Sequence, residues 1–201
     1  MSYRRSSPFA PISVLVLITL NVVVFIAIRA NPDLVSTLAL QPSTWTDEPW
    51  TLLTSIFTHY EIWHILANMI TLFFFGRYLS MMVGDTRFLI VYFLGGIIGN
   101  FLVILLAPLS AQSGDLFLGA SGAIFAVAGA VTVLVPKLKV IVFPIPAPIP
   151  LWVAVLGMFT ILTLLAPYFN IAWQAHLGGL IVGLAAGYFF KKRRPNMPVF
   201  R

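Results

Sequence analysis

The sequence contains no cysteine and few charged residues. None of its 201 residues is cysteine, which excludes disulfides, thiolate nucleophiles and cysteine metal sites. Only 9% are Asp, Glu, Lys or Arg and 60% are hydrophobic, whereas soluble domains carry about 25% charged and about 45–50% apolar residues. The composition therefore indicates a membrane protein and disfavours a soluble domain.

The apolar residues fall in long runs rather than in helix or strand periodicities, which is typical of membrane spans. Candidate helices lie at residues 10–28, 61–83, 88–106, 119–135, 151–166 and 171–190. The first run is longer than the core of a secretory signal, so we interpret it as a retained span. We predict an all-α polytopic membrane protein with six transmembrane helices, one domain over 1–201 that ends in a basic cytoplasmic tail at 191–201.

Two connections between these runs differ from ordinary loops. Residues 30–60 are too polar to span and long for an unstructured connection, so we expect this outer loop between the first two helices to be functional. Between the fourth and fifth runs stand Pro144, Pro146, Pro148 and Pro150. Because proline removes helical hydrogen bonds, we expect a loop there.

The distribution of charge predicts the orientation. An even number of crossings places both termini on one side, and the side rich in Lys and Arg is cytoplasmic. All basic residues except Arg29 fall on the side of the termini, and all acidic residues except Asp85 fall on the other. We therefore expect a multi-pass protein of the cell membrane with cytoplasmic N- and C-termini. The basic residues form no stripe interleaved with aromatic residues, so no nucleic-acid partner is expected.

Small residues recur at four-residue spacing inside several predicted helices. They are Gly95 and Gly99, Gly122 and Ala126, and Gly179, Gly183 and Gly187. Such spacing lets helix backbones approach closely in a membrane. It predicts contact between the fourth and sixth helices.

Three predicted helices bring chemically reactive side chains to one depth. With this topology the second, fourth and sixth helices all run inward from the outer face. His64, Asn68, Ser121 and His176 then lie roughly 5–10 Å below the helix starts, at a rise of about 1.5 Å per residue. An intramembrane histidine is by default a candidate functional residue.

These side chains suit acyl transfer. A serine hydroxyl such as that of Ser121 needs a neighbouring base, and the imidazole of His176 is of the usual kind. The side chains of His64 and Asn68 and the backbone N–H of Ser121 are candidate oxyanion donors. No acidic residue lies at this depth, so we predict a dyad. Phe125 follows Ser121 at i+4 and is placed to stack on His176.

Each residue alone also has an ordinary structural explanation. Ser121 could be an N-cap, a lone buried histidine a core residue, and Asn68 a bridge between helices. We interpret His59 as an anchor of the long connection, and Asn21 and Asn100 as structural hydrogen-bonding residues. The functional prediction depends on the convergence of several residues.

At these positions the sequence resembles the rhomboid family. The stretch GASG at 119–122 resembles its GxSG nucleophile motif, and His64 with Asn68 resembles its HxxxN motif. The last helix is similar in Ala175-His176 and the glycines that follow, and the stretch FTH at 57–59 also matches. The resemblance covers about residues 8–190.

The resemblance implies an intramembrane serine endopeptidase that cleaves transmembrane segments of other membrane proteins. Ser121 would be the nucleophile, His176 the general base and acid, and His64 and Asn68 the oxyanion donors. Gly119, Gly122 and Phe125 would support the site, which would open toward the outer face. The implied partners are transmembrane protein substrates and the lipid bilayer.

Three positions depart from the pattern of many rhomboids. Thr51 follows Trp50 where many members have arginine, and Ser80 stands where many have glutamate. We expect both to concern the anchoring of the outer loop. Phe125 replaces a tyrosine of some members, which preserves the stacking.

Two other functions agree with parts of the sequence. A catalytically silent rhomboid-like protein would bind transmembrane helices without cutting them, but Ser121 and His176 are intact. A small transporter would need polar residues that continue to the inner face, where the helices are almost wholly apolar. No cofactor or metal is expected, because three histidines without cysteine or a nearby carboxylate make a poor metal cage.

Overall fold

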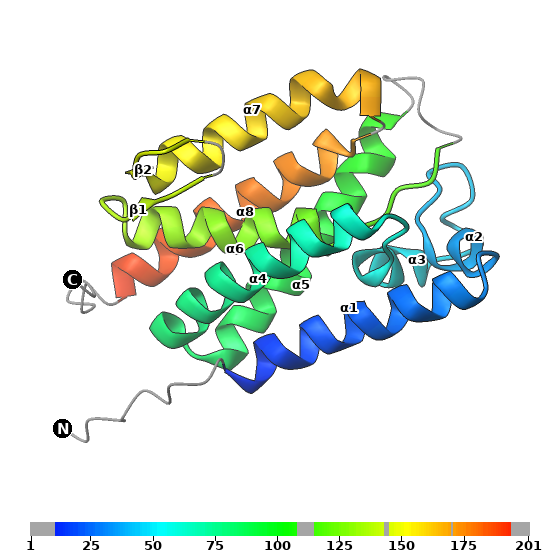
Figure 1. Cartoon of the computed structure of the whole chain (residues 1–201), viewed down its shortest axis with the longest axis horizontal. Coiled ribbons are helices and arrows are strands. Elements are labelled where there is room, and N and C mark those ends of the chain that lie inside the picture. Colours follow the sequence, from blue (N-terminus) through cyan, green and yellow to red (C-terminus); the bar gives the residue numbers. More distant parts are fainter. Residues whose placement is uncertain (1–10, 108–114, 143–144, 170, 194–201) are drawn as a thin grey trace.

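The computed structural model describes residues 11–107, 115–142, 145–169 and 171–193. Long helices packed side by side dominate these residues (Figure 1). They are α1 (Ile12–Ala30), α4 (Ile62–Val83), α5 (Asp85–Leu106), α6 (Ser121–Leu134), α7 (Leu151–Phe169) and α8 (Trp173–Arg193). The first residues of α1 and the last of α8 lie at one end of the bundle, which we call the terminal end.

The opposite end, which we call the loop end, holds the connection between α1 and α4 (Figure 1). This α1–α4 connection, residues 31–61, contains α2 (Leu34–Leu38), α3 (Thr51–Thr54) and the 3-10 helix η1 (Ser55–Phe57). The long predicted loop therefore has helical structure of its own.

Every predicted span contains a helix, with shifted boundaries. α1 begins at Ile12 and continues to Ala30, and residue 10 lies outside the described part of the chain. α5 begins three residues earlier than predicted, at Asp85, directly after Gly84. α7 continues to Phe169. α8 includes Lys191, Lys192 and Arg193, so the start of the predicted tail is helical, and residues 194–201 lie outside the described ranges.

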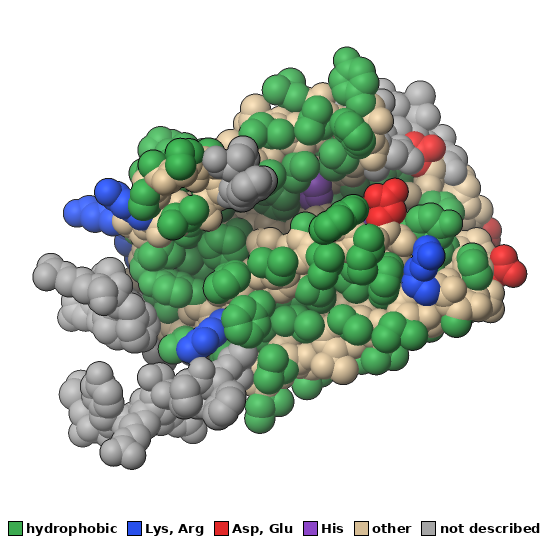
Figure 2. All heavy atoms as spheres, in the orientation of Figure 1, with side chains coloured by type: hydrophobic (Ala, Val, Ile, Leu, Met, Phe, Trp, Pro, Cys, Tyr) green, Lys and Arg blue, Asp and Glu red, His purple; other side chains and the backbone are tan. Residues whose placement is uncertain are grey.

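The helices identify a membrane protein. By length and composition α1, α4 and α5 can each cross a membrane, and α6 and residues Leu151–Ala166 of α7 are shorter apolar helices. Apolar side chains cover much of the visible surface between the two ends of the bundle (Figure 2), as expected for a face in contact with lipid. The helical membrane bundle is confirmed, whereas six crossings remain a prediction.

The predicted loop between α6 and α7 is closed by a short strand pair. Lys139–Val140 (β1) pairs antiparallel with Ile149–Pro150 (β2), with Lys139 opposite Pro150. The N–H of Leu151 also donates to Leu138 O at 2.8 Å. Proline disfavours a helix, and the described residues between α6 and α7 contain none, as predicted. The two-residue strand pair that closes this loop was not predicted. Pro144 lies outside the described residues.

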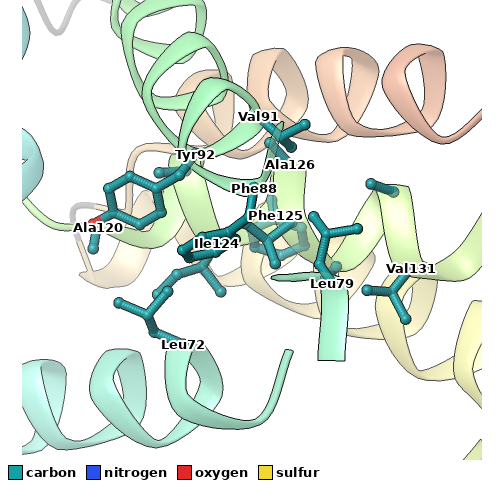
Figure 3. Packing of buried hydrophobic residues seen from close by; sticks show 14 of the residues in the cluster. Leu72, Leu79, Phe88, Val91, Tyr92, Ala120, Ile124, Phe125, Ala126 and Val131 are labelled. Atoms are coloured by element: carbon teal, nitrogen blue, oxygen red, sulfur yellow. The ribbon is translucent and has the colours of Figure 1, made fainter. Parts of the chain in front are cut away.

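The centre of the bundle is α6, in which every residue from Gly122 to Val131 is buried. Side chains of α4, α5 and α6 meet in the core, including those of Leu72, Phe88 and Ile124 (Figure 3). On its other side α6 packs against α8, where Gly179 lies so close to the carbonyl of Gly122 that no Cβ fits between them. The predicted contact between these helices is confirmed.

The α1–α4 connection is tied to α5 by one buried side chain. Asn100 Nδ2 donates to Leu52 O at 2.9 Å and to Ser55 Oγ at 2.8 Å. The structural role predicted for Asn100 is confirmed. Thr51 lies in the same region, buried, and its hydroxyl donates to Glu48 O at 2.6 Å. This bond lies within the connection itself, so a role of Thr51 in anchoring the connection to the bundle stays a prediction.

Ser80 has a different environment from the one expected. It lies in the last turn of α4, at the terminal end of the bundle, and its hydroxyl bonds to the carboxylate of Asp85. Gly84, at a φ of 88°, forms the tight junction between α4 and α5 beside this pair. The expectation that Ser80 anchors the outer loop was wrong, because that loop meets the opposite end of α4.

Charged side chains separate toward the two ends of the molecule. Most of the Lys and Arg side chains visible in Figure 2 lie toward the terminal end, whereas Asp and Glu lie toward the end with α2 and α3, where one basic side chain is also visible. This separation is the pattern from which the orientation of the chain was predicted.

Candidate active site

Ser121 and His176 meet at the loop end of α6 and α8. Ser121 is the first residue of α6, and His176 lies in the first turn of α8. Ser121 Oγ is 2.7 Å from His176 Nε2, within hydrogen-bond distance. His176 is buried, with 3% of its surface exposed. Residues from two distant parts of the sequence thus form a serine–imidazole pair.

Small residues explain why these two helix starts come together. A Cβ on Gly122 would lie 3.1 Å from the carbonyl oxygen of Ala175, the residue before His176. A Cβ on Gly99 of α5 would lie 2.7 Å from the same oxygen. Side chains at these glycines would push α8 away from α5 and α6, and the serine–imidazole distance would grow.

The turn before Ser121 depends on Gly119. Its φ of 117° lies in the region that favours glycine, and the first helical hydrogen bond of α6 follows, from Ile124 N to Ala120 O at 2.9 Å. The N-cap is Ala120, without a side-chain capping bond. The interpretation of Ser121 as an ordinary N-cap was therefore wrong, and its hydroxyl is directed to His176.

Phe125 lies against the imidazole of His176. The ring centroids are 4.7 Å apart with an interplanar angle of 30°, which is the stacking expected from the i+4 spacing. Phe159 of α7 packs edge-on against Phe125 at 6.1 Å. Within the described residues His176 Nδ1 has no hydrogen-bond partner. The ring is held by packing in place of a carboxylate.

His64 of α4 lies against the turn that precedes Ser121. A Cβ on Gly119 would lie 2.7 Å from both Cε1 and Nε2 of His64, so the imidazole rests directly on the Gly119 backbone. Asn68 is buried one turn further along α4, and its Nδ2 donates to His64 O at 2.8 Å. One amide N–H is thus used within α4, and the second is left for another acceptor.

His59 has closer contact with this site than the prediction of a loop anchor suggested. Its side chain is fully buried, and its ring centroid is 4.8 Å from that of His64 at an angle of 64°. His59 Nε2 accepts the N–H of Ala120 at 3.4 Å. Burial lowers the pKa of His59 to about 3, which keeps the ring neutral near pH 7. The signals in the sequence were its closeness to His64 and its place in the stretch FTH at 57–59.

The site offers no metal cage in the part of the chain that is described. There, no three His, Cys, Asp or Glu side chains lie close enough together to hold an ion. The chemistry available is that of a hydroxyl beside a neutral imidazole, at the N-terminus of a helix whose first N–H groups lack helical partners.

Comparison with known proteins identifies the family of this chain. The family model described as the Rhomboid domain matches residues 46–193. The mitochondrial Rhomboid protein 1 of Saccharomyces cerevisiae is 34% identical over 142 residues, which cover 69% of this chain and 41% of the yeast protein. The chain thus spans less than half the length of that relative.

Two bacterial relatives carry protease in their names. Rhomboid protease GlpG of Haemophilus influenzae is 29% identical over 157 residues, which cover 74% of this chain and 73% of GlpG. Putative rhomboid protease YdcA of Bacillus subtilis is 42% identical over 82 residues, which cover 41% of this chain and 39% of YdcA. Because the family model matches most of the sequence, including every residue of the candidate site, this chain belongs to the rhomboid family.

Proposed function

We propose that this chain is an intramembrane serine endopeptidase that cleaves transmembrane segments of other membrane proteins. The observation that carries the proposal is the 2.7 Å contact between Ser121 Oγ and His176 Nε2. A serine hydroxyl becomes an effective nucleophile when an adjacent base takes its proton. The names of the two bacterial relatives support the same activity.

The reaction proceeds through an acyl-enzyme. Ser121 Oγ attacks the carbonyl carbon of the scissile peptide bond while His176 Nε2 takes the hydroxyl proton. His176 then gives this proton to the leaving nitrogen, and the C–N bond breaks, which leaves an ester on Ser121. Water attacks the ester, its proton passes to His176, and the return of a proton to Ser121 Oγ releases the carboxylic acid.

The negative charge that develops on the carbonyl oxygen needs preorganised donors. We assign this role to the imidazole of His64, the Asn68 amide and the backbone N–H of Ser121. The contact of His64 with Gly119 supports its part, because it places the imidazole beside the nucleophile turn. The N-terminus of α6 adds its unpaired N–H groups and the positive end of its dipole.

The proposal includes a location for the site. All six long helices cross the cell membrane, with both termini in the cytoplasm and the site open toward the outer face. The separation of charge supports this orientation. A substrate helix must lose backbone hydrogen bonds before attack, so segments with helix-breaking residues are preferred.

A fluorophosphonate probe tests the proposal directly. The purified protein is treated with the probe in detergent and in lipid, and the adduct is located by peptide mass. We expect labelling of Ser121 that is lost in Ser121→Ala and His176→Ala. The control is Ser36→Ala, which removes an exposed hydroxyl on α2 and should leave labelling unchanged.

Folded wild-type protein that takes up no label in either environment would contradict a protease. That result would favour a catalytically silent rhomboid-like protein that binds transmembrane helices, or a small transporter. Labelling of Ser121 followed by cleavage of a transmembrane segment in proteoliposomes is the result expected of the protease.

A further inference from the structure

The backbone that leads into Ser121 is held by the α1–α4 connection. Phe117 and Leu40 exchange two backbone hydrogen bonds, of 2.7 and 2.8 Å. The N–H of Gly119 donates to Ser55 O at 2.9 Å, and the N–H of Ala120 donates to His59 Nε2. Groups outside α6 therefore hold this turn.

Ser55 is itself held in place. Its hydroxyl accepts a hydrogen bond from Asn100 of α5, which also binds Leu52 O, and its side chain is buried. The acceptor for Gly119 is thus fixed by a third helix. The third acceptor is His59. It accepts the N–H of Ala120 with a side-chain nitrogen, whereas Leu40 and Ser55 accept with backbone oxygens.

His59 contacts both sources of the proposed oxyanion donors. On one side its ring packs against His64 of α4, and on the other its Nε2 binds the N–H of Ala120, next to Ser121. A Cβ on Gly119 would lie 2.7 Å from the ring of His64 and 3.9 Å from Nε2 of His59, so the three groups are in contact. One buried ring thus joins α4 to the start of α6.

We propose that His59 is a positioning residue. It holds the His64 imidazole and the Ser121 backbone N–H at fixed positions relative to each other, so that both act as oxyanion donors. This inference rests on the proposed function. For Nε2 to accept the Ala120 N–H, the ring must be neutral and carry its hydrogen on Nδ1. Because the oxyanion exists only during the reaction, loss of this arrangement lowers kcat and changes KM little.

The test compares two substitutions of His59. His59→Leu fills the space without an acceptor, whereas Oε1 of His59→Gln reaches the place of Nε2. Tyr60→Leu, at the exposed neighbouring residue, is the matched control. Turnover of a transmembrane substrate is measured in proteoliposomes and divided by the number of sites that the fluorophosphonate titrates.

We expect His59→Leu to lower kcat roughly 10- to 100-fold with KM within about twofold, because small misplacements of reacting groups cost this much. His59→Gln should recover most of the loss, and Tyr60→Leu should match the wild type. The midpoints of the pH–rate profile should not move, since His176 is unchanged. Wild-type kcat in folded His59→Leu, or equal losses in the Leu and Gln variants, would overturn the inference.

A second measurement uses the wild-type protein, so it tests the positioning role of His59 even if His59→Leu does not fold. Nitrogen-15 NMR of histidine-labelled wild-type protein should show the Nδ1–H form of His59, with coupling between Nε2 and the Ala120 amide. The Nε2–H form would overturn the inference. Failure of the proposed function is distinguishable, because it leaves the wild-type protein itself unlabelled by the fluorophosphonate.

Discussion

The two ends of the bundle use buried polar groups differently. At the loop end, side chains of α5, α6, α8 and the α1–α4 connection bond to groups on other elements, as in the pairs Ser121–His176 and Asn100–Ser55. Toward the terminal end the core is made of apolar residues such as Leu79, Val83 and Val131. The polar pair described there, Ser80–Asp85, joins the ends of two helices that are consecutive in the chain.

The distribution of these polar groups indicates where the molecule can perform chemistry. A polar network between elements fixes the relative positions of groups that react, whereas a local pair stabilises only one junction. The loop end has such a network, and it surrounds Ser121. The bonds of this network join the elements around the serine–imidazole pair, which supports the proposed protease.

The largest effect is expected from the dyad itself. Ser121→Ala or His176→Ala should lower kcat by about 10⁴-fold or more, since each removes a group that makes or breaks bonds. Ser80→Ala, a hydroxyl deletion at the terminal end, should leave kcat unchanged. Turnover of a transmembrane substrate in proteoliposomes measures all three variants. Equal losses in Ser80→Ala and Ser121→Ala would remove the functional distinction between the ends.

Removal of one oxyanion donor should have the next largest effect. His64→Ala should lower kcat by about 10²–10³-fold and change KM little, because the donor acts on charge that develops in the transition state. The number of fluorophosphonate-reactive sites should remain near one per chain, although each reacts more slowly. A wild-type kcat in His64→Ala would exclude His64 from the oxyanion site.

Two glycines with positive φ give a matched comparison between the ends. Gly119 has a φ of 117° and lies against His64, whereas Gly84 has a φ of 88° and an added Cβ would have no neighbour within 4 Å. Gly119→Ala and Gly84→Ala should each cost about 1–3 kcal/mol in backbone strain. Only Gly119→Ala should also lower kcat, by up to about 10²-fold, because the added methyl group displaces the imidazole of His64.

Thermal unfolding and turnover per titrated site separate these two effects. A loss of kcat in Gly84→Ala equal to that in Gly119→Ala would show that strain alone, at either end, disturbs the site.

The sequence predicted the helices and the serine–imidazole pair for the same physical reason. Long apolar runs must be helical in lipid, and helices that start at one depth bring their first turns together. The glycines of α6 and α8 then allowed the contact between Ser121 and His176 to be predicted from spacing. Phe125 followed from the i+4 rule.

The remaining errors concern contacts that no periodic pattern encodes. The bond from Ala120 to His59 depends on how the α1–α4 connection folds over the helix starts, so the sequence alone predicted His59 only as an anchor of that connection. Ser80 was assigned to the wrong end, because a departure from a family pattern identifies a position and not its environment. The β1–β2 pair was missed because strands of two residues are too short to show an alternating pattern in the sequence.

The smallest predicted effect concerns acid stability and the buried ring at the loop end. His59 has a pKa lowered from 6.5 to about 3, chiefly by burial and further by His64, so the unfolded chain binds its proton more readily than the folded one. The contribution of the neutral ring to stability is therefore complete above about pH 6.5 and is lost as the pH falls toward about 3. The melting temperature of the wild type should decrease over this range by a few degrees more than that of His59→Gln, which has no group to protonate there. Both proteins share every carboxylate, so the difference between their curves isolates His59. Parallel curves would mean that the ring is accessible to solvent and does not hold the Ala120 N–H in a buried contact.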